Sequence, residues 1–148
     1  METNSDPFDL QRFVRAQEAN YDDALAEIKA GRKRTHWSWY VFPQVAGLGS
    51  SPMSVRYAIS GVQEAKAYLA HPVLGRRLRE CVAAMLSNTG RNAAAILGDI
   101  DALKFRSCLT LFARAEPTAP FREALLQFFG GTEDQNTLSI LALQARQE

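Results

Sequence analysis

The sequence predicts an all-α protein, a compact single domain (residues 1–148) of about seven helices packed around a central apolar helix. Three observations support this fold class. Apolar residues recur at three- and four-residue steps in most segments, and glycines, prolines and N-cap residues separate those segments. No run alternates with a period of two for long enough to demand a strand, and residues 39–42 are the only candidate for one.

The composition bounds the class of protein. With 47% hydrophobic and 22% charged residues, the chain of 148 residues fits a globular domain. Its 17 Lys and Arg residues balance 16 Asp and Glu residues, which argues against a nucleic-acid partner. No stretch approaches the roughly 18 apolar residues of a membrane span, and residues 1–6, read as a flexible N-terminus, lack the pattern of a signal peptide. We therefore expect a cytoplasmic protein with no membrane partner, while the oligomeric state stays open.

Cysteine and histidine usage argues against redox and metal chemistry. Cys81 and Cys108 each lie in an apolar helical pattern, where a lone cysteine behaves as a small buried hydrophobe. There is no Cys-x-x-Cys spacing, and His36 and His71 are the only imidazoles. We therefore predict free thiols, no metal site and no cofactor.

Clear signals bound the first two helices. Asp6 is a favoured N-cap and Pro7 suits the first helical position, so the first helix is expected to begin there and to end near Ala19. Asn20 caps the second helix, and Gly31 ends it.

Residues 36–44, with the sequence His-Trp-Ser-Trp-Tyr-Val-Phe-Pro-Gln, contain both tryptophans of the chain. Each aromatic side chain buries about 150–250 Å², so this segment is predicted to organise its neighbours. The basic residues 32–34 precede it and are either a solvated helix C-terminus or an anion contact beside an aromatic floor. The Gly/Ser-rich residues 47–52 are expected to form an ordinary loop, because no apolar strand precedes them as a phosphate-binding loop requires.

Cap residues, prolines and glycines also mark the ends of the remaining helices. His71 is read as a cap-region residue, and the segment that starts at Pro72 is the clearest amphipathic helix. Residues 100–113 are apolar almost all round and are the predicted centre of the core. These later helices are expected over residues 60–70, 72–87, 92–97, 100–113, 121–129 and 132–143.

Lys104 interrupts the central apolar helix. Asp101 lies three residues earlier and is placed to pair with it. The alternative is a pocket, because a desolvated lysine is costly unless it meets a carboxylate or a ligand anion. Asp134 likewise has two readings, as the cap of the last helix or as a functional carboxylate.

The chain resembles the domain-of-unknown-function family eighteen-ten over nearly its whole length. The string His-Trp-x-Trp-Tyr-x-Phe-Pro-Gln at residues 36–44 is the most specific part of the resemblance. The resemblance implies a small, largely helical, stand-alone bacterial protein and carries over no catalytic residues. The other matching elements lie at residues 9–13, 16–17, 47–49, 65–74, 101–104, 110–112 and 134–137.

A second similarity is to N-glycosidases that act on NAD- and ADP-ribose-derived compounds, in the order helix, Lys104-Phe105, helix, acidic residue. That family ends in an Asp-x-x-Trp-Gly segment, whereas residues 134–137 of this chain contain no tryptophan. Glycosidic cleavage needs a stacked flat ring, a carboxylate near the developing oxocarbenium ion and a cation for phosphate. The residues proposed for these roles are Trp37 or Trp39, Asp134 or Asp101, and Lys104 or Arg34.

Two functions follow from these patterns. The first is a small-ligand-binding domain or enzyme for a nucleotide-like metabolite, with N-glycosidic cleavage as its reaction. The second is a non-catalytic protein-interaction or structural domain in which the aromatic segment is packed core. A concave pocket lined by His36, Trp39, Gln44 and Lys104 favours the first, and full burial of both tryptophans without a cavity favours the second. The ligand-binding candidates are His36, Trp37, Trp39, Gln44 and Lys104.

Overall fold

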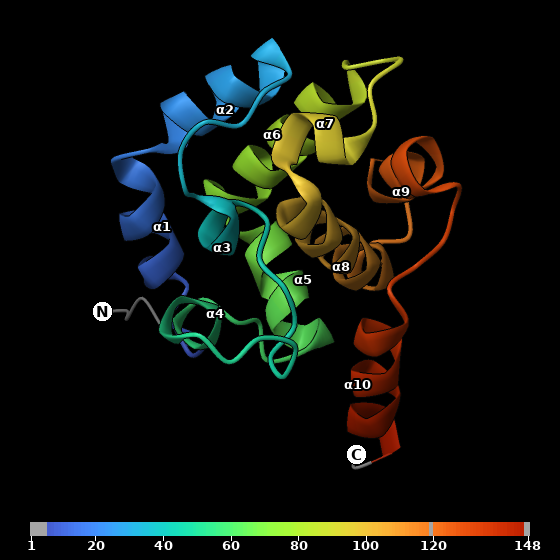
Figure 1. Ribbon diagram of the computed structural model, residues 1–148. Helices are drawn as coiled ribbons and strands as arrows, with labels where there is room; N and C mark the ends of the chain where they lie inside the picture. Colours follow the sequence, from blue (N-terminus) through green and yellow to red (C-terminus); the bar gives the residue numbers. More distant parts are fainter. Residues whose placement is uncertain (1–5, 119, 147–148) are drawn as a thin grey trace.

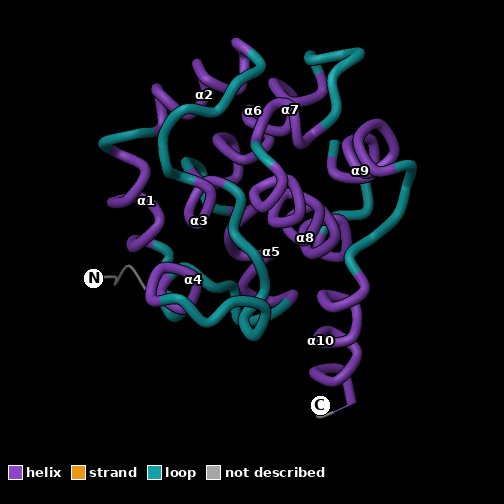
Figure 2. The backbone as a smooth tube through the Cα atoms, in the orientation of Figure 1, coloured by secondary structure: helices purple, strands orange, loops and turns teal. Residues whose placement is uncertain are grey.

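The computed structural model describes residues 6–118 and 120–146, and these residues form ten helices. The all-α fold class and the compact single domain are confirmed. Figure 1 shows the helices in chain order, and Figure 2 distinguishes the helices from the loops in the same view. The helices are α1 (Gln11–Glu18), α2 (Tyr21–Ala30), α3 (Ser38–Val41), α4 (Pro52–Arg56), α5 (Val62–Ala70), α6 (Leu74–Leu86), α7 (Ala93–Leu97), α8 (Asp99–Ala115), α9 (Phe121–Phe129) and α10 (Gln135–Arg146).

Helix α8 lies at the centre of the molecule, as its apolar pattern predicts. It packs against α3, α5, α7, α9 and α10 (Figure 1). Phe105, Cys108, Leu109 and Phe112 on this helix are completely buried. Its N-terminal turn differs, because Ile100 and Leu103 are exposed there. The same helix therefore forms the core along most of its length and reaches the surface where it begins.

The aromatic segment forms the short helix α3, so residues 39–42, which were the one candidate for a strand, are not a strand. The Val41 amide donates to the Trp37 carbonyl at 3.1 Å, and the Phe42 amide donates to the Ser38 carbonyl at 2.9 Å. Aromatic residues favour strands, but this propensity is weak and the tertiary context of the segment overrides it. The helical turn buries Trp37 and Val41 and turns Trp39 toward the surface.

The loop after α3 is tied to the segment after α4. The Ala46 amide donates to the Ile59 carbonyl, and the Ile59 amide donates to the Gln44 carbonyl, each at 2.8 Å. This pair of bonds is a single parallel bridge between Val45 and Ile59. It holds residues 44–46 beside the segment that follows α4.

The first helix starts four residues later than predicted. Asp6 does act as a cap, but its carboxylate accepts from the amides of Leu10 at 2.8 Å and Gln11 at 3.0 Å. Asp9 between them has a positive φ of 52°, which interrupts helical geometry. Residues 1–5 of the predicted N-terminal tail lie outside the described residues.

Both cysteines are free and buried, as predicted. Burial raises the pKa of the Cys81 thiol to about 12, so this thiol is unreactive at neutral pH. None of the described helices combines the length and the apolar character that crossing a membrane requires.

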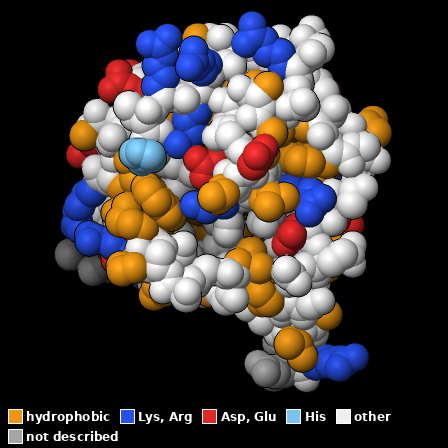
Figure 3. Space-filling view, viewed as in Figure 1, with side chains coloured by type: hydrophobic (Ala, Val, Ile, Leu, Met, Phe, Trp, Pro, Cys, Tyr) orange, Lys and Arg blue, Asp and Glu red, His pale blue; other side chains and the backbone are white. Residues whose placement is uncertain are grey.

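The surface charge is uneven although the net charge is close to zero. Lys and Arg side chains gather at the top of the view in Figure 3, over α2. The exposed residues Lys29, Arg32, Arg34 and Arg91 form this end of the molecule, which we call the basic end. Arg91 joins it to α7, because its guanidinium donates to the Gly31 carbonyl at 3.2 Å.

Candidate functional site

A partly buried carboxylate fixes the path of the chain into α3. Glu27 Oε1 accepts from the Arg34 amide at 2.8 Å, the Thr35 amide at 3.0 Å and the indole Nε1 of Trp37 at 2.9 Å. Glu27 Oε2 accepts from Thr35 Oγ1 at 2.7 Å. Trp37 is also completely buried. The bonds to Glu27 and the burial of Trp37 therefore fix the position of the residues that lead into α3.

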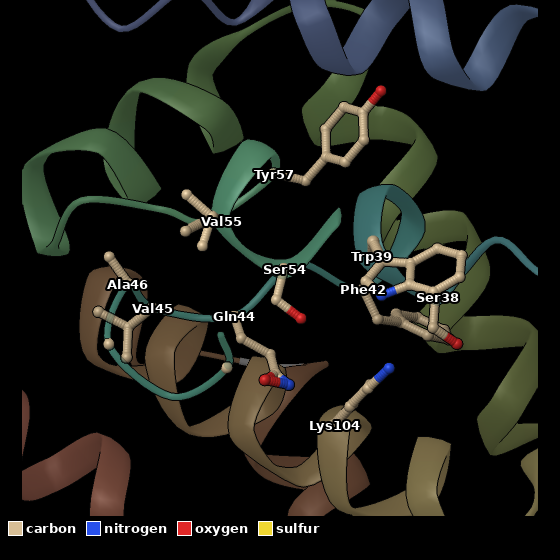
Figure 4. Close-up of a pocket in the computed structure, with 13 residues that line it drawn as sticks. Ser38, Trp39, Phe42, Gln44, Val45, Ala46, Ser54, Val55, Tyr57 and Lys104 are labelled. Carbon is tan, nitrogen blue, oxygen red and sulfur yellow. The ribbon is translucent and has the colours of Figure 1, made fainter. Parts of the chain in front are cut away.

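A cavity of about 130 Å³ lies between α3, residues 44–49, α4 and α8. We call it the ring pocket. Its walls are mostly apolar, as in small-molecule sites. Figure 4 shows three polar side chains that point into it from different elements, Gln44 from the loop, Ser54 from α4 and Lys104 from α8. The residues that line it are Ser38, Trp39, Phe42, Gln44, Val45, Ala46, Gly47, Gly49, Ser54, Val55, Tyr57, Ala58 and Lys104.

A second hollow, of about 460 Å³, lies on the other side of Trp39. We call it the lysine pocket. It shares Ser38, Trp39 and Lys104 with the ring pocket, so the two are adjoining parts of one cleft. The lysine pocket is lined by Lys33, His36, Trp37, Ser38, Trp39, Leu97, Gly98, Asp99, Ile100, Asp101 and Lys104.

In the lysine pocket, each of two lysines contacts both a carboxylate and a tryptophan ring. Lys33 Nζ lies 2.9 Å from Asp101 Oδ2, and Lys104 Nζ lies 3.5 Å from Asp101 Oδ1. Each ammonium also lies over a tryptophan ring, with Lys33 Nζ 5.2 Å from Trp37 and Lys104 Nζ 5.1 Å from Trp39. One carboxylate thus serves two lysines, both held by cation–π contacts.

The structure brings together most of the residues that the sequence proposed as ligand-binding. Trp39, Gln44 and Lys104 line the ring pocket, and His36, Trp37, Trp39 and Lys104 line the lysine pocket. His36 and Gln44 are therefore on opposite sides of Trp39 and do not share a pocket. Trp37 contributes a buried wall, whereas Trp39 is only partly buried and reaches both pockets.

The two proposed acids have different surroundings. Asp101 lies in the lysine pocket, and it pairs with Lys104 as the sequence spacing indicated. Asp134 lies in a third hollow, which Gln44 and Lys104 also line. Its Oδ2 accepts from the Thr137 amide at 2.9 Å and from Thr137 Oγ1 at 2.6 Å, so it has the helix-cap role.

Two residues of the cleft escaped sequence analysis. Lys33 was grouped with the basic residues 32–34, but only 8% of its side chain is exposed and it faces Asp101. Ser38 is 3% exposed, and no hydrogen bond to its Oγ is found within the described parts of the chain. The only available signal was that a basic triplet adjoins a tryptophan-rich segment, which does not tell which lysine turns inward.

The family described as "Protein of unknown function (DUF1810)" matches residues 7–141. Among solved structures, the conserved hypothetical protein Rv1873 from Mycobacterium tuberculosis is similar. It is 51% identical, the alignment covers 93% of this chain and 99% of that chain, and the TM-score is 0.91. No match was found among curated proteins. The matched region includes every residue that lines the ring and lysine pockets.

Proposed function

We propose that this chain, which belongs to the DUF1810 family, binds a small nucleotide-like molecule in the cleft formed by the ring and lysine pockets. One observation carries the proposal. Trp39 is half-buried between the two pockets and has a lysine ammonium 5.1 Å from its ring. An indole face suits a flat heteroaromatic ring, and the adjacent cation suits an anionic substituent on the same ligand.

The polar groups of the ring pocket support a ligand with hydrogen-bonding edges. Ser51 Oγ donates to Ser54 Oγ at 2.8 Å, which leaves the Ser54 hydroxyl proton available to an acceptor. The side-chain amide of Gln44 is partly buried and lines this pocket. An amide offers a donor and an acceptor side by side, as a nucleobase edge does. A purely structural core would need neither group.

The test is titration with NAD, ADP-ribose, AMP and adenosine, followed by calorimetry and by tryptophan fluorescence. We expect at least one of them to bind, and the Trp39→Ala variant to bind it about five- to 150-fold more weakly, because base–aromatic stacking is worth about 1–3 kcal/mol. Phe8→Ala is the matched control, since Phe8 also packs partly buried against the core but lies outside both pockets. Absence of heat and of fluorescence change at millimolar concentrations of all four compounds contradicts the proposal.

The second candidate is hydrolysis of an N-glycosidic bond in the same ligand. The position of Asp101, in the pocket that Trp39 and Lys104 share, favours it. In this reaction water forms a bond to C1′ and releases a proton, while the C1′–N bond breaks and its electron pair goes to the ring nitrogen. A carboxylate next to the ring can stabilise the oxocarbenium charge that develops. Asp101 is therefore the carboxylate to which we assign the stabilisation of this charge.

Chromatography of NAD and ADP-ribose incubated with the protein tests the reaction. The hydrolysis proposal predicts release of the free base by the unmodified protein and at least a hundred-fold slower release by Asp101→Asn. Asp134→Asn is the control, because Asp134 serves as a helix cap. Binding without release of base excludes the hydrolysis and leaves the binding proposal standing.

A further inference from the structure

We infer that the lysine pocket is a phosphate subsite, so that the ligand is a nucleotide rather than a nucleoside or a free base. The inference rests on the proposed function for the ring and adds the chemical class of the group beside it. Three independent features support it: an excess lysine, an uncapped helix N-terminus and a buried hydroxyl without a partner.

The first feature is an imbalance of charge. Asp101 is the one carboxylate that pairs with Lys33 or Lys104 among the described residues, so one positive charge is left over. The side chains of Lys33 and Lys104 are only 8% and 24% exposed. A buried ammonium is costly without a counterion. Asp99 also borders the pocket, but it is exposed, and water and salt screen its charge.

The second feature is the N-terminus of α8. Gly98 precedes this helix of 17 residues, and no side chain caps it. Gly98, Asp99, Ile100 and Asp101 all line the pocket, so the free amides of the first turn lie at its wall. Such amides and the helix dipole together form a recurrent binding site for phosphate.

The third feature is the Ser38 hydroxyl. Ser38 is 3% exposed and lines both pockets, yet its Oγ has no hydrogen-bond partner within residues 6–118 and 120–146. Buried hydroxyls are almost always hydrogen-bonded, and an exception requires an explanation. A phosphate oxygen in the lysine pocket supplies the missing acceptor. This observation is independent of the two lysines, Lys33 and Lys104, and of the N-terminus of α8.

The basic end of the molecule lies next to this pocket. Arg32 and Arg34 flank Lys33 in the sequence, and both are exposed. Such a patch raises the local concentration of anions and speeds their association. The positive electrostatic potential of the basic end would therefore attract a phosphorylated ligand toward the lysine pocket.

The experiment measures binding of inorganic phosphate by thermal shift at constant ionic strength, with sodium chloride as the balancing salt. We expect saturable stabilisation of the unmodified protein and at least about ten-fold weaker binding to Lys33→Gln, since a charge-assisted hydrogen bond is lost. Lys66→Gln is the matched control, because it removes the same charge from an exposed position on α5, outside both pockets and outside the basic end. Equal weakening by both variants, or by neither, overturns the subsite.

Ser38→Ala provides a second test that does not depend on charge. The variant removes the unpartnered hydroxyl, so the ligand-free protein should unfold at the same temperature or a higher one, while phosphate binding weakens several-fold. Comparison of AMP with adenosine then separates the two proposals. If inorganic phosphate binds but no compound with a heteroaromatic ring does, the result supports the subsite and contradicts the proposed function. Equal affinity for AMP and adenosine, unchanged by Lys33→Gln, overturns the subsite and leaves the proposed function in place.

Discussion

The Glu27 carboxylate sets the position of residues 34–37 by four hydrogen bonds. Burial acts to raise its pKa, but the bonds from the Arg34 amide, the Trp37 indole and Thr35 outweigh it and lower the pKa from 4.5 to about 2. A carboxylate whose folded pKa is depressed stabilises the fold above its unfolded pKa. That stability is lost as the pH falls from about 4.5 toward 2.

We therefore predict that Glu27→Gln lowers the melting temperature at pH 7 and that this deficit shrinks as the pH falls from about 4.5 toward 2. The amide keeps an acceptor oxygen but loses the charge, so the pH dependence isolates the carboxylate. Melting curves of both proteins between pH 7 and pH 2 measure the effect. Glu18→Gln, on the exposed face of α1, is the control. A deficit that is constant with pH argues against the depressed pKa.

Substitution of Lys104 distinguishes a role in stability from a role in ligand binding. The contact of Lys104 with Asp101 is an i,i+3 pair at 3.5 Å, and i,i+3 pairs on a helix contribute about 0.2–0.5 kcal/mol. Lys104→Met should thus change the free energy of unfolding in urea by no more than about 1 kcal/mol, while ligand affinity falls at least about ten-fold. A large loss of stability without a loss of affinity identifies Lys104 as a structural residue.

The sequence predicted the residues of the cleft that break a pattern and missed those that do not. Lys104 stands out in an apolar helix, and Trp39 and Gln44 stand out in the aromatic segment. Lys33 and Ser38 look like ordinary surface residues, and only the tertiary structure shows that they face inward. Side-chain direction near a helix end depends on contacts with α8, which no local pattern encodes.

The start of α8 depends on the backbone conformation of one glycine. Gly98 has φ 91° and ψ 160°, a region that residues with a Cβ rarely adopt. A Cβ added there meets nothing within 4 Å, so glycine is needed for the conformation and not for space. Gly130, at the end of α9, has φ 61° and ψ 23°, which is ordinary left-handed geometry, and its surroundings are equally open.

This pair of glycines gives a matched prediction. We expect Gly98→Ala to lower the free energy of unfolding by about 1–3 kcal/mol, and Gly130→Ala by about 1 kcal/mol. Chemical denaturation of both variants measures the difference. Gly98→Ala should also weaken phosphate binding, because it moves the first amides of α8. Equal or smaller destabilisation by Gly98→Ala than by Gly130→Ala contradicts the assignment of backbone strain.

The success of the sequence prediction varies with the length of the helix. Helix α8 covers 17 residues, and its apolar pattern predicted both its extent and its central position. Helices α3 and α4 have four and five residues, which is too short for a repeat of three to four residues to register. These two helices form walls of the ring pocket, so the elements that build the site are those that sequence periodicity detects least.

At the scale of the whole molecule, the cleft and the core are continuous. The Phe42 ring in the ring pocket lies 4.7 Å from Phe105, which in turn lies 6.0 Å from Phe128, between centroids. Trp37, which lines the lysine pocket, lies 5.9 Å from Phe42. Aromatic packing therefore connects both pockets to α8 and α9. A ligand in the cleft should accordingly stabilise the fold as a unit.

That continuity leads to a prediction about ligand-linked unfolding. A nucleotide present at a hundred times its dissociation constant stabilises the folded protein by about 2.7 kcal/mol. For a domain of this size, about 1 kcal/mol corresponds to a shift of about 2–4 °C, so we expect one cooperative transition that moves upward by about 5–11 °C. Calorimetric scans with AMP measure it, and Trp39→Ala should show a smaller shift at the same AMP concentration, about half as large if its binding is ten-fold weaker. A separate low-temperature transition that alone responds to AMP would instead make the cleft an independent unit, because residues 36–58 would then unfold without disturbing α8.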